Sequence, residues 1–270
     1  MRAFFLRIDG MRYVLGIDVG SSFTKAVVLR EKDLLSWAGI PSGGNHAEAA
    51  RKVSQTVLEK AGLSNTDVST TIATGYGAAA AGFADRIVAD ISCQAAAIHH
   101  LFPTAGTVVD IGSQFCRVIR MDENGRAANF VQNEKCAGGS GKFLQVIARI
   151  LHISFDDIGA LSLQSANPVE FTTGCAVFAE SEAVSRIAEG ASPADILAGV
   201  HKAISAKIAN LTIRLGLAQD CAVTGGGAKD IGLVRTLASE LSVQLLVPEE
   251  PWITAAMGAA LTCFQDWTQP

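Results

Sequence analysis

The amino-acid sequence predicts an α/β protein built from two duplicated halves. Three observations lead to this prediction. A chain of 270 residues can bury a large core, and its length suits two lobes better than one. A β-hairpin with a polar, glycine-containing turn occurs twice. A third glycine cluster ends a short strand after the long helical stretch Ile196–Leu217.

Composition and charge exclude several classes of protein. Hydrophobic residues make up 49% of the chain and charged residues 18%, which is typical of a compact protein rather than a disordered one. The net charge of −4 gives no sign of a nucleic-acid surface. No apolar run approaches the roughly 20 residues that span a bilayer, and the apolar stretch near the start is too short for a signal peptide. We therefore expect a cytoplasmic protein with no nucleic-acid or membrane partner.

The repeated hairpin is the main evidence for duplication. The segment Asp18-Val-Gly-Ser-Ser-Phe-Thr-Lys25 aligns with Asp110-Ile-Gly-Ser-Gln-Phe-Cys-Arg117, and Lys25 faces Arg117 in this alignment. Each copy follows one apolar run and precedes another, which predicts a strand, a tight glycine turn and a second strand. Because Asp-x-Gly is common in turns, one copy alone is equally consistent with a structural turn. Two copies with matched flanks favour a duplication.

Both turns have the composition of an anion site. Gly20 and Gly112 let the backbone approach a ligand closely, and backbone N–H groups in a turn bind anions. Further donors and a positive charge come from Ser21, Ser22, Thr24 and Lys25. Asp18 and Asp110 cannot face a phosphate directly, so a hydrated Mg²⁺ between them is their natural partner. The residues therefore predict a phosphate and metal site.

The third glycine cluster, Gly225-Gly226-Gly227, leads from a strand toward a helix. Such a cluster is a weak signal alone, but its position suits the adenosine end of a nucleotide.

Two other nucleotide-binding motifs are not present in the sequence. In the segment Cys136–Phe143, a cysteine and a phenylalanine occupy the first glycine and the Ser/Thr positions of a P-loop. No G-x-G-x-x-G follows a strand, so a dinucleotide fold has no support.

In this order, the three loops resemble those of the actin, hexokinase and sugar-kinase superfamily of ATPases. The resemblance implies a duplicated two-lobe fold, with a mixed sheet flanked by helices in each lobe and ATP in the cleft between them. The expected lobes are residues 11–106, with the first phosphate loop, and 107–270, with the second phosphate loop and the adenosine loop. A return of the C-terminal helix to the first lobe is left open.

Two of the six cysteines precede predicted helices. The segment after Cys136 has a helical pattern with Ser140 as its cap. Cys175 opens a second helix, whose apolar face includes Val184 and Ile187. The dipole and the free N–H groups of a helix N-terminus favour a thiolate, and they equally favour the negative charge of an iron–sulfur cluster.

The residues leave the role of these cysteines open. A [4Fe–4S] cluster normally has four thiolate ligands, and this chain offers two in suitable places, so two chains related by a two-fold axis would complete a site. A buried, inert thiol is the alternative for each cysteine. A zinc site would need the same two-chain arrangement.

Both cysteine segments closely resemble those of the activator ATPases of 2-hydroxyacyl-CoA dehydratases. That family also includes the ATP-binding subunits of benzoyl-CoA reductase. The residues that carry the resemblance are Asn133–Leu144, Cys175–Glu182, Ala73–Gly77 and Asp90–Cys93. The resemblance extends from about Tyr13 to Leu261.

The resemblance implies a homodimer with one [4Fe–4S] cluster, bound by Cys136 and Cys175 of each chain. It also implies ATP or ADP bound by Gly20, Ser21, Ser22, Phe23, Thr24, Lys25, Gly112, Ser113, Gly225, Gly226, Gly227 and Lys229, with Trp252 stacking on adenine. The family's second loop usually reads Asp-Ile-Gly-Gly-Gln-Asp. Here Ser113 and Phe115 replace its second glycine and second aspartate, which bears on the hydrolysis rate and the metal contacts.

The resulting hypothesis is electron transfer driven by ATP. A ferredoxin or flavodoxin is the expected electron donor, and an iron–sulfur acyl-CoA dehydratase or reductase is the expected acceptor. In this hypothesis Asp18 and Asp110 organise Mg²⁺, and Gln114 orients the attacking water. The alternatives are a small-molecule kinase, with Glu180 or Glu182 as the general base, and an ATP-dependent binding module with structural cysteines.

Overall fold

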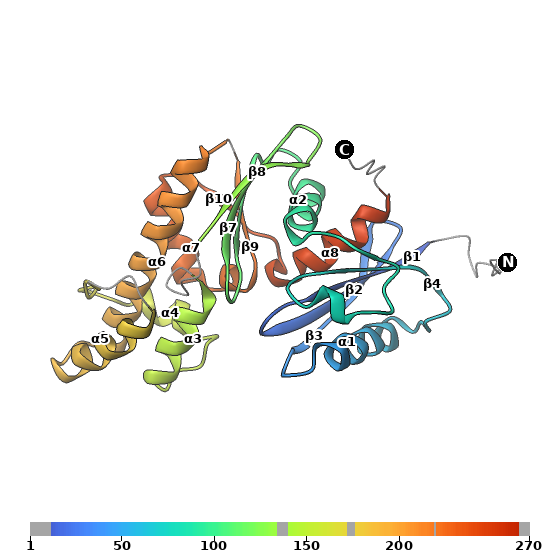
Figure 1. Ribbon diagram of the computed structural model, residues 1–270. Helices are drawn as coiled ribbons and strands as arrows, with labels where there is room; N and C mark the ends of the chain where they lie inside the picture. Colours follow the sequence, from blue (N-terminus) through green and yellow to red (C-terminus); the bar gives the residue numbers. More distant parts are fainter. Residues whose placement is uncertain (1–11, 134–139, 172–175, 219, 265–270) are drawn as a thin grey trace. The chain divides into compact units, whose positions relative to one another are not determined.

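The computed structural model describes residues 12–133, 140–171, 176–218 and 220–264. These residues form two compact units. The first contains the described residues up to His100 and those from Ile253 onward, and the second is Leu101–Trp252. Each unit is built on a five-stranded mixed sheet that helices flank (Figure 1). Among the described helices, none is long and apolar enough to cross a membrane.

The first unit has the sheet order β3-β2-β1-β4-β5. Its elements are β1 (Tyr13–Val19), β2 (Phe23–Arg30), β3 (Asp33–Pro41), α1 (His46–Ala61), β4 (Val68–Thr74), η1 (Ala78–Ala80), β5 (Arg86–Ile87), α2 (Asp90–Leu101), α8 (Thr254–Leu261) and η5 (Thr262–Phe264). β1, β2 and β3 form an antiparallel meander, and β4 runs parallel to β1. Apolar residues of α1, such as Val53 and Val57, recur every four positions and pack against one face of this sheet.

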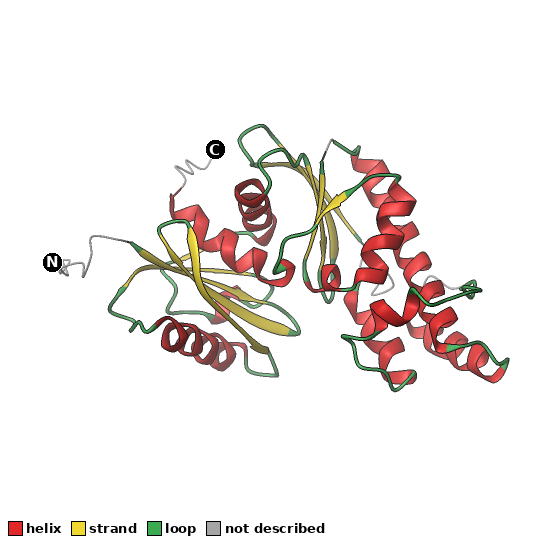
Figure 2. Ribbon diagram, turned by 180° about the vertical axis from the view of Figure 1, so that it is seen from behind, coloured by secondary structure: helices red, strands yellow, loops and turns green. Residues whose placement is uncertain are grey.

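The helix α8 packs against β1, β2 and β4 (Figure 2). Two glycines permit this approach. A Cβ on Gly16 would lie 2.0 Å from the Ala256 carbonyl oxygen, and a Cβ on Gly258 would lie 1.7 Å from the Cys93 carbonyl oxygen. Because backbone atoms cannot yield at such distances, close packing of α8 on the sheet and on α2 requires glycine at both positions.

The second unit has the sheet order β10-β9-β6-β7-β8. Its elements are β6 (Thr107–Ile111), β7 (Cys116–Met121), β8 (Ala127–Gln132), α3 (Gly141–Ile150), α4 (Ile158–Ser162), α5 (Ala176–Ala188), α6 (Pro193–Leu215), β9 (Cys221–Thr224), η3 (Gly226–Lys229), α7 (Ile231–Leu241), β10 (Leu245–Leu246) and η4 (Pro251–Ile253). Read from the β8 edge, the order of strands matches the first unit strand for strand. The duplicated fold predicted from the two hairpins is therefore confirmed.

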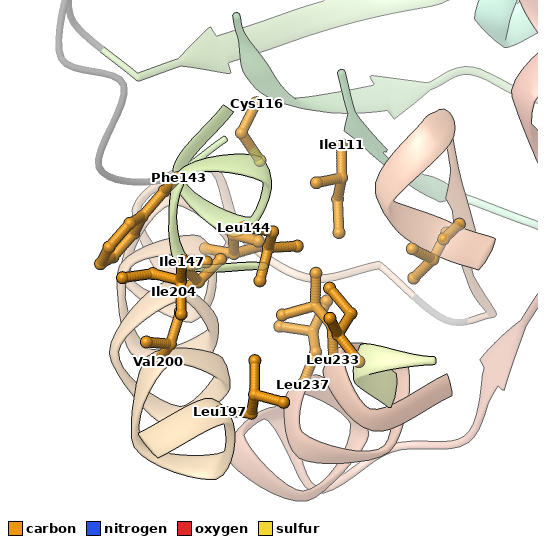
Figure 3. Packing of buried hydrophobic residues seen from close by; sticks show 14 of the residues in the cluster. Ile111, Cys116, Phe143, Leu144, Ile147, Leu197, Val200, Ile204, Leu233 and Leu237 are labelled. Carbon is orange, nitrogen blue, oxygen red and sulfur yellow. The ribbon is translucent and has the colours of Figure 1, made fainter. Parts of the chain in front are cut away.

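A large apolar core fills the second unit (Figure 3). In α3, Phe143, Leu144 and Ile147 are fully buried, which is the i, i+1, i+4 spacing of an inward helix face. They meet residues of α6, such as Val200 and Ile204, in one cluster. The helix predicted after Cys136 is thus confirmed from Gly141 onward, and its apolar side fixes it to the unit.

The apolar face predicted for the second cysteine helix is not the face that packs on its unit. In α5, the buried positions are Ala179 and Ala183, whereas Val184 is 53% exposed and Ile187 42% exposed. Phe178 on the same helix is 67% exposed. Small alanines therefore allow α5 to pack closely on the unit, and the side chains of Phe178, Val184 and Ile187 face outward.

Candidate functional site

The first predicted phosphate loop is the turn between β1 and β2. The Gly20 N–H donates to the Phe23 carbonyl oxygen at 3.2 Å, and a Cβ on Gly20 would lie only 2.6 Å from that oxygen. Asp18 and Lys25 are directly opposite each other on the two strands, and their side chains form an ion pair. Both side chains are about nine-tenths buried, at 10% and 12% exposure. A carboxylate and an ammonium group are thus held beside a tight turn.

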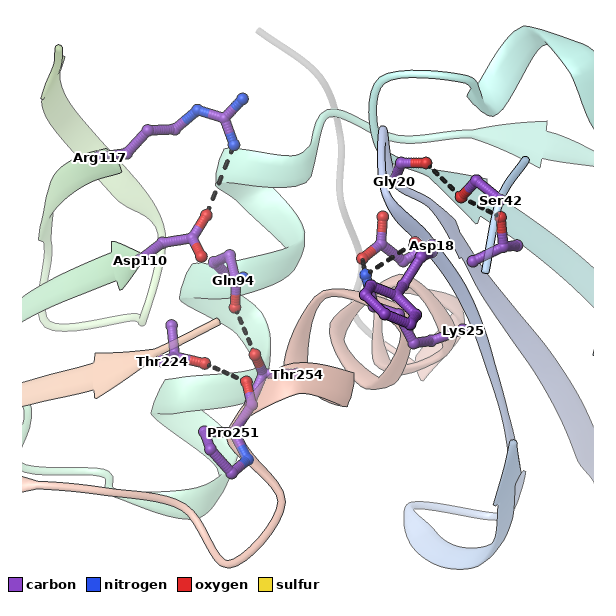
Figure 4. A network of polar contacts seen from close by, with 12 residues as sticks. Asp18, Gly20, Lys25, Ser42, Gln94, Asp110, Arg117, Thr224, Pro251 and Thr254 are labelled. Carbon is purple, nitrogen blue, oxygen red and sulfur yellow. Dashed lines mark hydrogen bonds and ion pairs between the residues drawn. The ribbon is translucent and has the colours of Figure 1, made fainter. Parts of the chain in front are cut away.

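Ser42, at the end of β3, fixes the orientation of this turn. Its hydroxyl donates to the Gly20 carbonyl oxygen at 2.6 Å and lies 2.9 Å from the Thr24 hydroxyl, while its N–H donates to the Ser22 carbonyl oxygen at 2.9 Å (Figure 4). Ser42 is buried. Two carbonyl groups of the turn are therefore tied to the third strand, a role that the sequence does not indicate.

Replacing Ser42 with alanine is expected to lower the stability by about 1–3 kcal/mol, because the Gly20 carbonyl and the Thr24 hydroxyl lose a buried partner. Binding of ADP is expected to weaken several-fold in the same variant. Thermal unfolding and calorimetric titration measure the two effects. Ser54→Ala is the matched control, since the Ser54 hydroxyl is buried but donates within α1 to the Ala50 carbonyl. Unchanged ADP binding in folded Ser42→Ala would contradict the assignment of this turn.

The second predicted phosphate loop is the turn between β6 and β7. The Gly112 N–H donates to the Phe115 carbonyl oxygen at 2.9 Å, as at Gly20 in the first turn. Asp110 lies opposite Arg117, whose Nη1 is 3.5 Å from Oδ2 of Asp110. The Arg117 guanidinium also lies over the Phe115 ring, 5.3 Å from its centroid. The aromatic residue at this position thus serves as a support for the basic side chain.

The start of α3 holds the second turn. The N–H groups of Gly141 and Lys142 donate to the carbonyl oxygens of Gly112 and Ser113, both at 2.9 Å. Ser140 occupies the predicted N-cap position, but its side chain makes no capping hydrogen bond. Two N–H groups at the start of this helix are therefore bound by the turn and are not available to another ligand.

The third glycine loop connects β9 to α7. Gly225 has a left-handed backbone with φ +82°, and a Cβ there would lie 2.6 Å from both Oδ1 of Asp110 and the Ile111 carbonyl oxygen. A Cβ on Gly227 would lie 2.4 Å from Cγ2 of Ile111. These two glycines therefore bring the loop directly against Asp110 of the second hairpin, while Gly226 is exposed.

The predicted residues Lys229 and Trp252 belong to the same part of the second unit. The Gly225 N–H and the Thr224 hydroxyl both donate to the Pro251 carbonyl oxygen, at 2.9 and 2.8 Å. This places Trp252, the next residue, beside the glycine loop. The Lys229 ammonium lies over the Trp252 ring, 5.0 Å from its centroid. The indole face is thus covered by a flexible cation.

A buried contact between an aspartate and a histidine lies at the end of the glycine loop. Asp230 follows Lys229 and caps α7 by accepting from the Leu233 N–H at 3.0 Å. Its other carboxylate oxygen is 2.9 Å from Nε2 of His201 on α6, and the His201 side chain is fully buried. The sequence analysis did not identify this pair, because the two residues come from separate helices.

A fourth loop, Thr74–Gly77, completes the repeat. In the first unit Asp18 pairs with Thr74 of β4, and in the second unit Asp110 pairs with Thr224 of β9 in the same parallel register. Each threonine precedes a glycine with positive φ, +92° at Gly75 and +82° at Gly225. A Cβ on Gly75 would lie 2.2 Å from Oδ1 of Asp18. The repeated Thr-Gly-x-Gly was the available signal for this loop.

The remaining predicted residues fall into two groups. Ser21 and Ser22 are half-buried in the first turn, Phe23 is 41% exposed, and Gln114 is exposed at the second turn. Cys136 and Cys175 lie outside the described residues. Within the described ranges, no group of three or more His, Cys, Asp or Glu side chains is placed to hold a metal ion.

Three other cysteines are buried core residues. Cys93, Cys116 and Cys221 are free and buried. Burial raises the pKa of Cys93 and of Cys221 to about 12, and it also raises the pKa of Cys116. These thiols therefore stay protonated at neutral pH and are poor ligands.

Comparisons with known proteins agree with this architecture. The activator of lactoyl-CoA dehydratase from Anaerotignum propionicum is 39% identical over 254 residues, which cover 94% of this chain and 98% of that protein. One of the subunits of benzoyl-CoA reductase from Thauera aromatica is 34% identical over 264 residues, which cover 93% of both proteins.

Two solved structures extend the comparison. The activator of the 2-hydroxyisocaproyl-CoA dehydratase from Clostridium difficile, with bound ADPNP, superimposes with a TM-score of 0.90 at 36% identity, covering 93% of this chain and 94% of that one. A ROK family glucokinase from Streptomyces griseus, in complex with glucose and AMPPNP, gives a TM-score of 0.58 at 14% identity, covering 92% and 98%. The similarity to the glucokinase confirms the predicted sugar-kinase-like fold and carries no information about the activity of this chain.

The family assignment rests on most of the chain. The model of the BadF/BadG/BcrA/BcrD ATPase family matches residues 15–263, which include both hairpins, the third glycine loop and both cysteine segments. This chain therefore belongs to the BadF/BadG/BcrA/BcrD ATPase family.

Proposed function

We propose that this ATPase is an activator that passes a low-potential electron to a partner iron–sulfur enzyme, such as a 2-hydroxyacyl-CoA dehydratase. The duplicated site is the observation that carries the proposal. In both units, an aspartate is flanked by a basic residue on one strand and a Thr-Gly loop on another. Relatives with 35–39% identity over most of the chain are named as dehydratase activators.

ATP binding is the best-supported part of the proposal, because the chain belongs to an ATPase family and a close structural relative contains ADPNP. The turns at Gly20 and Gly112 would receive phosphates through backbone N–H groups. Asp18 and Asp110 are each paired with a basic side chain. A hydrated Mg²⁺ would contact the two carboxylates through its water molecules. Gln114 is exposed and would orient the attacking water.

Cys136 and Cys175 are the proposed ligands of a [4Fe–4S] cluster shared by two copies of the chain. In the sequence, both precede helices that the structure describes, since α3 begins at Gly141 and α5 at Ala176. Four thiolates from two copies make the usual ligand set. Such a cluster would supply the site that accepts and releases one electron.

The exposed side of α5 supports association with a second copy. Phe178, Val184 and Ile187 place large apolar side chains in solvent on the helix that follows Cys175. Exposed apolar residues that gather on one element are typical of an interface. A homodimer formed near this helix would cover them and bring the second pair of cysteines to the first.

The proposed electron donor is a ferredoxin or flavodoxin, and the partner enzyme would perform the acyl-CoA chemistry. A kinase activity has less support. Glu182, one of its candidate bases, is 3.8 Å from the Arg186 guanidinium and is occupied by this ion pair. The similarity to the glucokinase concerns the fold alone.

Anaerobic purification of the full chain tests the proposal. We expect a brown dimer with about four irons per dimer, an absorption that bleaches on reduction, and ATP hydrolysis by the same preparation. Iron analysis, light scattering and a phosphate-release assay measure these properties. A colourless monomer that hydrolyses ATP would overturn the electron-transfer function while leaving the ATPase assignment in place.

A further inference from the structure

The two phosphate turns are held by different elements, although the turns themselves are duplicates. In the first unit, the carbonyl of the turn glycine, Gly20, accepts from the Ser42 hydroxyl. In the second unit, the carbonyl of the equivalent glycine, Gly112, accepts from the Gly141 N–H. A serine at the end of a strand has thus been replaced by the first residue of α3. That helix begins five positions after Cys136.

Hydrogen bonds to carbonyl groups also set the direction of N–H groups. A trans peptide is planar, and its C=O and N–H point to opposite sides. The described residues contain no cis peptide bond. Because α3 holds the carbonyl groups of Gly112 and Ser113, the N–H groups of the same two peptides, on Ser113 and Gln114, point away from α3. The helix start therefore determines which way this turn presents its N–H groups.

We propose that Gly141 and Lys142 are positioning residues for nucleotide binding, which hold the second turn in its phosphate-binding orientation. By linkage, if these hydrogen bonds strengthen nucleotide binding, a bound nucleotide must stabilise the hydrogen bonds between the turn and α3 by the same free energy. Nucleotide binding would then change the stability of the first turn of α3. This inference rests on the proposed binding of ATP at the second turn, and it is independent of the cluster and of electron transfer.

The geometry at Gly141 allows one hydrogen bond to be removed without breaking the helix. Gly141 is the first helical residue, where proline is favoured because its N–H has no partner within the helix. The preceding residue, Ser140, has φ −128° and ψ 167°, which is the extended conformation required before proline. In Gly141→Pro, Cδ of the proline ring takes the place of the amide hydrogen that donates to the Gly112 carbonyl oxygen, so this hydrogen bond is lost and the carbonyl must move away from the start of α3.

The matched control is Gly141→Ala, which retains the N–H. An alanine Cβ would lie 3.6 Å from Cα of Ser113, an ordinary contact, and 3.3 Å from the Gly112 carbonyl oxygen, which would have to shift by a few tenths of an ångström. Ser42→Ala is the second control, because it loosens the first turn and leaves α3 in contact with the second.

The experiment measures ADP and ADPNP affinity by calorimetry, and amide hydrogen exchange of residues 140–150 with and without ADPNP. In the parent protein, ADPNP is expected to slow exchange in the first turn of α3. Gly141→Pro is expected to bind more weakly by about tenfold or more and to lose this protection, because a hydrogen bond worth about 1.4 kcal/mol is lost and the ring also displaces the Gly112 carbonyl. Gly141→Ala should bind within about threefold of the parent, and Ser42→Ala should retain the protection.

Two results would overturn the inference. The first is a folded Gly141→Pro variant with parental affinity. The second is a parent protein that binds ADPNP with no change in exchange at the start of α3, which decides the matter even where Gly141→Pro does not fold. A parent protein that binds no nucleotide would instead refute the proposed function.

Discussion

Replacing Cys136 or Cys175 with alanine is expected to give a colourless protein that still binds ATP. Each substitution removes two of the four proposed thiolate ligands from a dimer, since both copies carry it. We expect loss of iron and complete loss of electron transfer, whereas ADP affinity should stay within about threefold, because neither residue belongs to the phosphate turns. Visible absorption, iron analysis and calorimetric titration of anaerobically purified protein measure these outcomes.

Cys221→Ala is the control for this experiment. Cys221 is buried in β9, and burial raises its pKa to about 12, so it is not expected to bind iron. The Cys221 variant should therefore retain the full colour of the parent protein. A brown Cys136→Ala protein with an unchanged iron content would remove this residue from the ligand set.

Lys25→Met is expected to lower the rate of ATP hydrolysis by about 100- to 1,000-fold, the range observed when one preorganised group that stabilises developing charge is lost. Lys25 is nearly buried beside the first turn and is paired with Asp18. Its removal takes the cation from the turn and leaves the carboxylate of Asp18 without that partner. Steady-state phosphate release measures the effect, and thermal unfolding shows whether the variant remains folded.

Lys60→Met provides the comparison for a surface lysine. The Lys60 ammonium lies over the Trp37 ring, 5.8 Å from its centroid, and belongs to α1 rather than to a turn. Hydrolysis by this variant should match that of the parent protein. A folded Lys25→Met variant that hydrolyses ATP at the parental rate would refute the role assigned to Lys25 in hydrolysis.

The hairpins were predictable from sequence because they are local. Each hairpin, Tyr13–Arg30 or Thr107–Met121, is one continuous segment whose register follows from its turn, so Asp18 opposite Lys25 and Asp110 opposite Arg117 could be read directly. The helix after Cys136 could also be predicted from the sequence, since the spacing of its apolar residues matches its buried face. The family resemblance then supplied the fold of the whole chain.

Other features depended on long-range pairing and could not be read in this way. Thr74 and Thr224 meet the aspartates through parallel strands, which join residues far apart in the sequence. The bonds from Ser42 and from Gly141 depend on where a strand or helix ends in space. The outward orientation of the apolar side chains on α5 could not be read from the sequence, because periodicity identifies an apolar face without saying what covers it.

The packing of α8 on β1 has a consequence for synthesis on the ribosome. The second unit, Leu101–Trp252, is a continuous stretch and can fold as soon as it has emerged. The first unit must wait, because the surface around Gly16 is completed by Ala256 and its neighbours, which are translated after the whole of the second unit. The half of the protein that emerges first is therefore the last to finish folding. During that delay, the face of β1, β2 and β4 that α8 covers is open to chaperones.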